Sequence, residues 1–287
     1  SGEDSVIVNG HKTLIINRSK WIFDDKTEEY LIARLNRYNL TVVDQAYDPS
    51  NYTSRNIIGI QQGTKHPEKI LIVGGHHDAV ADYAADDNAS SMAAVLETAR
   101  ILSKKKFEYT IQYIFWDEEE YGDWGSKYHA KYIKSNKENI VGVVVLEMLG
   151  YDSNNDFKFD IQTDENQASV NLANTITDVI DLCNLNLHAN IVIPGTDRSD
   201  HYSYWREGIY YGVCYSGQML SGDANPAYHT NEERINLFNL PYFTELSKLT
   251  IALTAHLAKP VVLFTDSNEK ISQKEASFQI TQSNNKS

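Results

Sequence analysis

Short apolar segments alternate with longer amphipathic segments from residue 69 onwards, and no other feature limits the fold of this chain as strongly. Residues 69–75, 109–116 and 139–149 are apolar runs of strand length. The last is apolar along nearly its whole length, which is typical of a strand buried on both faces. Between the first two runs, residues 88–105 repeat apolar side chains at helical spacing. Strands that alternate with helices indicate a mostly parallel sheet between helical layers.

We therefore predict an α/β protein, a single-domain three-layer α/β/α sandwich with a mixed, mostly parallel central sheet. The domain is predicted to span residues 1–265, because no linker rich in Pro or Gly interrupts it. Within it, residues 1–63 are predicted to be an entry region of helix and strands packed on the rest, with a helix in 26–39. Residues 266–287 are predicted to be a polar tail, with at most one strand around 276–281.

The composition argues against nucleic acids and membranes as partners. The 287 residues carry a formal net charge of -13 without a cluster of Lys and Arg, which phosphate binding requires. No apolar run approaches the roughly 18 residues of a membrane span. The chain opens SGEDSVIV, with neither an initiating Met nor a signal-peptide pattern, so we expect a removed or trimmed signal and a secreted or periplasmic protein. We also expect a monomer.

Two cysteines, Cys183 and Cys214, leave the redox state of the chain open. Their number permits one disulfide, but two buried free thiols fit the sequence equally well.

Acidic and histidine side chains follow each apolar strand at the point where it ends. His76, His77 and Asp78 follow the first strand, residues 117–120 (Asp-Glu-Glu-Glu) follow the second, and Glu147 ends the third. Ligands bind at the carboxyl ends of strands in open α/β sheets. So many carboxylates at one edge would repel one another without a cation, and zinc accepts both His nitrogen and carboxylate oxygen.

Each of these signals also has an ordinary structural explanation. A lone His-x-Asp is usually a surface pair, adjacent glutamates usually face solvent, and Asp86-Asp87-Asn88 before a helix is typical of an N-cap. Their order, their spacing and their common place at strand ends favour a functional site.

In these blocks the chain resembles the M28 family of zinc exopeptidases, which includes bacterial leucyl aminopeptidases. The resemblance covers roughly residues 55–258. The matching segments, in the order of the family, are GGHHDAV (74–80), AADDNASSMAAVLE (84–97), DEEEYGDWGS (117–126), LEMLG (146–150), RSDHYSYWREGI (198–209) and YHTNEERIN (228–236).

The resemblance implies a two-zinc metallo-aminopeptidase that hydrolyses the N-terminal peptide bond of peptides with a free amine. It implies two zinc ions as cofactors, Asp87 as the carboxylate that bridges them and Glu119 as the general base. The residues that it implies as metal ligands are His76, Asp87 and Glu147 on one ion, and Asp87, Glu120 and His229 on the other. It further implies that Asp78 orients His76, and that Asp200 and His201 support the site without binding metal.

The segment Asp-Glu-Glu-Glu offers two Glu-Glu pairs, and its register needs a decision. The family pattern is Glu-Glu-x-Gly followed three residues later by Gly-Ser, and Gly122, Gly125 and Ser126 match it. This register selects Glu119 and Glu120, so Glu118 is expected to be a spare whose replacement by Gln costs little turnover.

His77 and two departures from the family pattern also bear on the site. Side chains alternate along a strand, so His77 is expected to point away from His76 and from metal. The segment between Asp78 and Asp87 is short, which we expect to narrow the loop there without disturbing the ligands. Asp123 stands where the family often has an apolar residue, which places the packing around it in question. Most of the 18 Tyr are expected in the core or on the surface, although some could line an aromatic pocket.

Three other functions remain open at this point. A single-zinc glutaminyl cyclase shares the fold and several motifs, but the complete set of five ligand-type residues favours two metals. An M28-type carboxypeptidase would need basic residues for the substrate carboxylate, and Arg198 and Arg206 are the only ones near the motifs. A catalytically inactive binding module would be expected to have lost at least one of the site residues.

Overall fold

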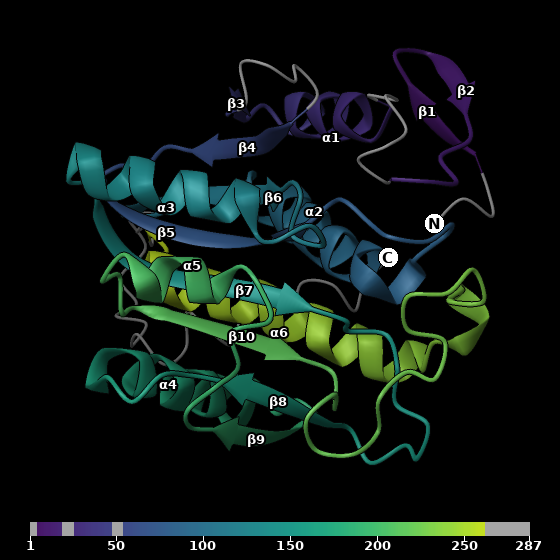
Figure 1. The fold of residues 1–287 in the computed structure, drawn as a ribbon. Helices are drawn as coiled ribbons and strands as arrows, with labels where there is room; N and C mark the ends of the chain where they lie inside the picture. Colours follow the sequence, from purple (N-terminus) through teal and green to yellow (C-terminus); the bar gives the residue numbers. More distant parts are fainter. Residues whose placement is uncertain (1–4, 19–25, 48–53, 262–287) are drawn as a thin grey trace, which may run out of the picture.

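The computed structural model describes residues 5–18, 26–47 and 54–261, and its centre is one eight-stranded mixed sheet (Figure 1). The strand order is β3-β4-β6-β5-β7-β10-β8-β9. These strands are β3 (Thr41–Ala46), β4 (Arg55–Gln61), β5 (His66–His76), β6 (Tyr109–Trp116), β7 (Asn139–Glu147), β8 (Lys158–Gln162), β9 (His188–Val192) and β10 (Gly212–Ser216). A separate antiparallel hairpin, β1 (Val6–Val8) and β2 (His11–Thr13), precedes them.

The middle of the sheet is parallel and its flanks are mixed. β5 pairs in parallel with β6 and β7, and β7 pairs in parallel with β10. β4 is antiparallel to β6, and β8 is antiparallel to β10. The carboxyl ends of β5, β6, β7 and β10 therefore meet at one edge of the sheet, and the loops that leave this edge carry the candidate site.

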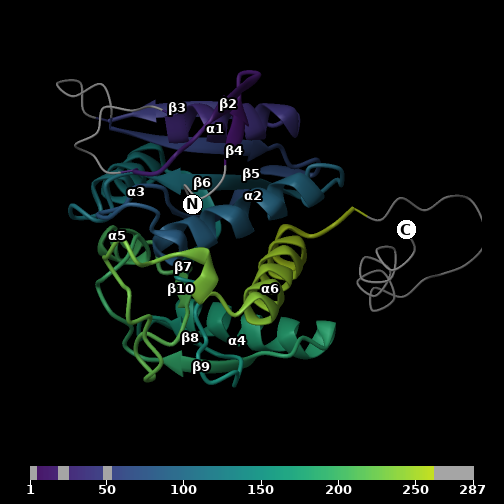
Figure 2. The same cartoon turned by 90° about the vertical axis from the view of Figure 1, so that its right-hand side faces the viewer.

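Helices cover both faces of the sheet. In Figure 2, α3 (Trp124–Asn136) and α5 (His201–Arg206) lie on one side of the strands, while α2 (Ser91–Leu102), α4 (Gln167–Cys183) and α6 (Leu240–Ala258) lie on the other. The helix α1 (Lys26–Arg37) packs on β3, β4 and α2. Side-chain caps start α4 and α6: Asn166 accepts the N–H of Ala168, and Asn239 accepts the N–H of Tyr242.

The core is divided in two by the alternation of side chains along each strand. Leu71 and Val73 of β5 belong to the larger cluster, which includes residues of α2, α4 and α6, whereas Ile72 belongs to the smaller cluster with Ala130 and Ile133 of α3. Two buried layers on opposite faces explain why the central strands are apolar throughout rather than alternating.

The predicted α/β sandwich with its mixed, mostly parallel sheet is confirmed, and the helix expected in 26–39 is α1. The β1–β2 hairpin and the short helix α5 were not predicted, since three-residue strands and a six-residue helix give little periodicity. The tail 266–287 and the strand proposed around 276–281 lie outside the described residues.

The structure resolves the question of the cysteines. Cys183 and Cys214 are both free. Cys183 packs against the larger cluster and Cys214 belongs to the smaller one, so the sheet separates the two thiols. Among the described residues, no helix has the length and apolarity that crossing a membrane demands.

Candidate active site

Five residues with metal-ligand chemistry converge at the carboxyl edge of the parallel strands. His76 is the last residue of β5 and Glu147 the last of β7. Glu120 lies in the loop after β6, His229 in the loop after β10, and Asp87 in a π-helical turn (Ala85–Ser90) that leads into α2. Gly75, directly before His76, allows the start of α2 to lie close to the end of β5, because a Cβ on Gly75 would lie 2.8 Å from Ser91 Cβ.

Asp87 is shared by two groups of ligand-type atoms. Its Oδ1 lies 3.1 Å from His76 Nε2, and its Oδ2 lies 3.0 Å from His229 Nε2. His76 Nε2 is also 3.1 Å from Glu147 Oε1, and His229 Nε2 is 3.0 Å from Glu120 Oε2. The ligand atoms of each group all lie within 4.8 Å of one another. One carboxylate thus presents a separate oxygen to each group.

The charges of these residues are unbalanced without a cation. Burial raises the pKa of Glu147 to about 7, although the charge of His76 opposes the shift. Burial would raise the pKa of Asp87 as well, but hydrogen bonds with His229 and His76 outweigh it and lower the pKa. Glu120 Oε1 is buried and accepts no hydrogen bond from any described residue. An oxygen of this kind, beside four other side chains of the types that zinc accepts as ligands, fits a bound divalent cation.

The carboxylates of the site raise the pKa of both histidines. Hydrogen bonds to Asp87 and Glu120 raise the pKa of His229 to about 10. Burial would lower the pKa of His76, but the charges of Glu147 and Glu119 raise it well above its ordinary value. Metal ligands must be deprotonated, so metal binding at this site would release protons.

Asp78 fixes the segment that carries the two adjacent glutamates. Its Oδ1 accepts the backbone N–H of Glu119 at 3.1 Å, and its Oδ2 accepts that of Glu120 at 3.2 Å. Oδ1 also lies 3.3 Å from Nδ1 of His76. Glu119 itself keeps its carboxylate 3.9 Å from His76 Nε2, outside both ligand groups. Burial raises its pKa well above the ordinary value, and the charge of His76 opposes the shift.

Glu233 and Asn88, for which the sequence predicted no role in the site, hold two of the carboxylate residues in place. Glu233 accepts the backbone N–H groups of Asp86 and Asp87 through one oxygen, at 2.8 Å and 2.5 Å. Asn88 donates to Glu147 Oε2 at 2.6 Å. Both residues stand inside the motif blocks, four residues after His229 and one after Asp87, and this proximity was the available signal.

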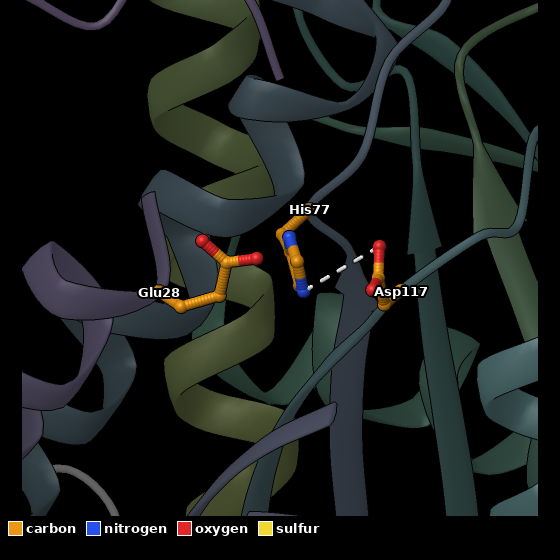
Figure 3. Close-up of side chains that lie close together, drawn as sticks. All are labelled: Glu28, His77 and Asp117. Carbon is orange, nitrogen blue, oxygen red and sulfur yellow. Dashed lines mark ion pairs between the residues drawn. The ribbon is translucent and has the colours of Figure 1, made fainter. Parts of the chain in front are cut away.

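His77 lies between Glu28 of α1 and Asp117, as Figure 3 shows, and belongs to a different group of ligand-type residues from His76. The three residues place ligand-type atoms within 4.8 Å of one another. Asp117 Oδ2, however, accepts the N–H of Arg55 at 3.0 Å, and His77 Nε2 lies 3.2 Å from the Arg55 carbonyl oxygen. This cluster joins α1 and β4 to the residues that directly follow β5 and β6.

Glu118 is buried rather than solvated. It is 4% exposed and accepts hydrogen bonds from the hydroxyl groups of Tyr47 and Ser54, each at 3.0 Å. It belongs to neither ligand group around Asp87. These contacts give Glu118 a structural role, in which it ties the loop after β6 to Tyr47 and Ser54.

Asp200 and His201 begin α5 and differ in their relation to the site. Burial raises the pKa of Asp200 well above its ordinary value, and the charge of His76 opposes the shift, so Asp200 is electrostatically linked to the ligands. His201 Nε2 lies 3.0 Å from the Thr196 carbonyl oxygen, and the ring packs edge-on against Trp205. His201 therefore holds the loop before α5.

The aromatic residues near these motifs are mostly structural. Tyr204 is fully buried, and its hydroxyl group accepts a hydrogen bond from Trp116 and contacts His129. Tyr215 belongs to the core, whereas Tyr211 is exposed. Tyr228 stacks on the ring of His229 at 3.7 Å, so one tyrosine does lie at the site.

The two departures from the family pattern are both accommodated. Asp123 precedes α3 and forms an ion pair with Lys127 at 3.3 Å. The short segment after Asp78 is covered by the N-terminal segment, where the carbonyl oxygen of Ile16 accepts the N–H of Tyr83 at 2.8 Å.

Comparison with known proteins yields one family. Residues 56–254 match the model of Peptidase family M28. Leupeptin-inactivating enzyme 1 of Streptomyces exfoliatus is 28% identical over 226 residues, which are 77% of this chain and 49% of that protein. Aminopeptidase YwaD of Bacillus subtilis is 29% identical over 193 residues, 65% of this chain and 41% of that protein. The chain thus spans about half the length of the first of these relatives, or less for the second.

Solved structures with the same fold include enzymes of two kinds. The LapA aminopeptidase of Legionella pneumophila superposes with a TM-score of 0.71 at 24% identity, over 86% of this chain and 69% of that one. A glutaminyl cyclase of Bacteroides thetaiotaomicron superposes with a TM-score of 0.61 at 18% identity, over 80% of this chain and 87% of that one. At these identities the likeness concerns the fold alone.

Proposed function

The chain belongs to peptidase family M28, and from this premise we propose that it is a two-zinc aminopeptidase that acts on peptides with a free N-terminus. One observation carries the proposal: Asp87 presents Oδ1 to His76 and Oδ2 to His229, in two separate groups of ligand-type residues. In a single-metal site, one oxygen of the carboxylate would be enough to bind the ion, and the second oxygen would not be expected to contact another histidine.

We assign His76, Asp87 and Glu147 to one zinc ion, and Asp87, Glu120 and His229 to the other. Bound zinc would polarise the scissile carbonyl and would make water acidic enough to lose a proton near neutral pH. The name of YwaD, an aminopeptidase, supports the same class of reaction.

Glu119 acts as the general base in this proposal. It accepts a proton from the attacking water and returns it to the leaving amine. Its carboxylate lies outside both ligand groups, 3.9 Å from His76 Nε2, and Asp78 fixes its backbone. The carboxylates of Glu119 and Glu147 also offer negative charge to the ammonium group of a substrate, which favours a free N-terminus over a blocked one.

The test is mass spectrometry of peptides incubated with the zinc-loaded protein. The set has N-terminal Leu, Phe, Ala, Glu and Gln, each with an N-acetylated control. We expect stepwise loss of N-terminal residues from the free peptides only. Loss of ammonia from the Gln peptide without shortening would instead indicate a glutaminyl cyclase. Shortening from the other end would indicate a carboxypeptidase, and unchanged peptides would leave a binding module.

A further inference from the structure

An arginine from outside the region that matches the family model holds the backbone that leads to Asp87. Arg18 donates from all three guanidinium nitrogens to main-chain carbonyl groups: Nε to His77 at 2.9 Å, Nη1 to Tyr83 at 3.0 Å and Nη2 to Ala84 at 2.9 Å. We propose that Arg18 is a positioning residue for the metal centre, which sets the backbone from which Asp87 bridges the two ligand groups.

The backbone that Arg18 contacts has an unfavourable conformation. Tyr83 and Ala84 have φ angles of 68° and 38°, so two consecutive residues with side chains adopt the left-handed conformation. Such residues persist only where their surroundings fix them. The carbonyl oxygens of both accept hydrogen bonds from the one guanidinium group, and its planar fork of donors matches this arrangement.

Neighbours of Arg18 dock on the same loop. The carbonyl oxygen of Ile16 accepts the N–H of Tyr83 at 2.8 Å, and Asn17 Nδ2 donates to Asp82 Oδ1 at 2.6 Å. Residues 16–18 therefore lie along residues 82–84 as a strap, and Arg18 is the member that also reaches His77, directly after the ligand His76.

The opposite side of the loop is held by Glu233. Its carboxylate accepts the N–H groups of Asp86 and Asp87, and its carbonyl oxygen accepts that of Ala85 at 3.1 Å. The segment from Tyr83 to Asp87 is thus held by residues 16–18 on one side and by Glu233, in the loop after β10, on the other. Loss of Arg18 would release the first side only.

The charge of Arg18 acts in the same direction. Burial lowers the pKa of the guanidinium, while the carboxylates of Asp87, Asp78, Glu233 and Glu120 raise it. An arginine stays cationic under such conditions. Its positive charge therefore offsets part of the electrostatic repulsion among these carboxylates when no ion is bound.

The loop can be tested without metal by hydrogen exchange. We expect Arg18→Met to raise the exchange rate of amides in residues 79–90 at least about tenfold in the metal-free protein. The exposed Arg37 of α1 provides a matched control, and Arg37→Met should leave these amides unchanged. Arg18→Lys keeps the charge but not the fork, so it should exchange like Arg18→Met. Wild-type protection in either Arg18 variant would overturn the positioning role.

The effect on the metal centre, which rests on the proposed function, is tested by titration with Co²⁺ and its visible absorption. We expect Arg18→Met to weaken Co²⁺ binding about 10- to 100-fold, as removal of supporting partners usually does, and to change the spectrum. Leu31→Val, in the core of α1, controls for general destabilisation and should keep wild-type binding.

The two readouts separate the possible failures. A wild-type protein that binds no Co²⁺ would remove the proposed function, while the exchange data would still decide whether Arg18 fixes the loop. Wild-type Co²⁺ binding in Arg18→Met, or weakening no greater than in Leu31→Val, would overturn the role of Arg18 in the metal centre.

Discussion

Asp78 accepts the backbone N–H of Glu119 through the same oxygen that lies 3.3 Å from His76 Nδ1. One carboxylate therefore sets the orientation of a histidine at the end of β5 and the position of the glutamate loop after β6. These contacts link the ends of β5 and β6 at the proposed site, so Asp78 helps to set the geometry of both His76 and Glu119.

Asp78→Asn is expected to reduce zinc affinity about 10- to 100-fold, because the amide offers one acceptor where the carboxylate supplies two, and it removes the charge beside His76. Zinc content after dialysis against graded metal buffers measures the effect. Asp44→Asn, in the surface ion pair with Arg55, serves as the control. Equal zinc retention in the two variants would mean that Asp78 does not act through His76.

Glu119→Gln is expected to retain zinc and to lose turnover by about 10²–10⁴-fold, because an amide cannot accept the proton of the attacking water. Metal analysis and kcat measured on the same preparations separate these effects. Glu118→Gln is the adjacent control. It should keep turnover and instead lose about 1–2 kcal/mol of unfolding free energy, through its contacts with Tyr47 and Ser54. A collapse of turnover in Glu118→Gln would show that the register of the pair is wrong.

Metal stoichiometry distinguishes two ions from one. We expect the wild type to bind two zinc ions, Glu147→Ala and Glu120→Ala to bind one tightly, and Asp87→Ala to lose both, because Asp87 belongs to both groups. Glu97→Ala, a surface residue paired with Arg100, should bind as the wild type does. Mass spectrometry under native conditions counts the ions. One ion in the wild type would favour the single-zinc cyclase.

Stability is expected to fall in mild acid partly because of His129. This residue is buried, and burial lowers its pKa from 6.5 to about 3. The unfolded chain therefore takes up the proton first. Stability is full above pH 6.5 and is lost, by about 1.4 kcal/mol per pH unit, as the pH falls towards 3.

Urea unfolding at a series of pH values tests this expectation. His129→Gln should flatten the dependence in that window, while His11→Gln, at an exposed position, should not. Parallel curves for the wild type and His129→Gln would show that His129 is not held neutral in the folded protein.

The sequence predicted most of the sheet and all five converging ligand-type residues, for identifiable reasons. Apolar runs such as 109–116 coincide with strands because they are buried on both faces, and His76 and Glu147 end strands that parallel pairing brings to one edge. Asp87, Glu120 and His229 came from the resemblance to the family, and the structure places them beside these two residues. The metal roles of these residues, the export of the chain and its monomeric state remain predictions.

What the sequence could not provide depends on contacts between distant segments. Arg18 stands 59 residues before His77, and Glu118 was expected to be a spare because nothing local shows that Tyr47 and Ser54 cover it. A hydrogen bond between a side chain and a carbonyl group far away in the sequence produces no periodic pattern of residues. Such partners appear only when the fold brings the segments together.

The shared position of Asp87 has a consequence for how the site arises as the chain is synthesised. His76, Asp87 and Glu147 have all emerged once β7 is complete, but Glu233, which accepts the backbone N–H of Asp87, follows only after β10. The second group waits for His229, which follows β10, and β10 must first insert between β7 and β8. Under the proposed function, a nascent chain that ends before residue 229 lacks both a ligand of the second ion and the Glu233 contact of Asp87, so hydrolysis begins only after the segment that follows the last strand of the sheet has been made.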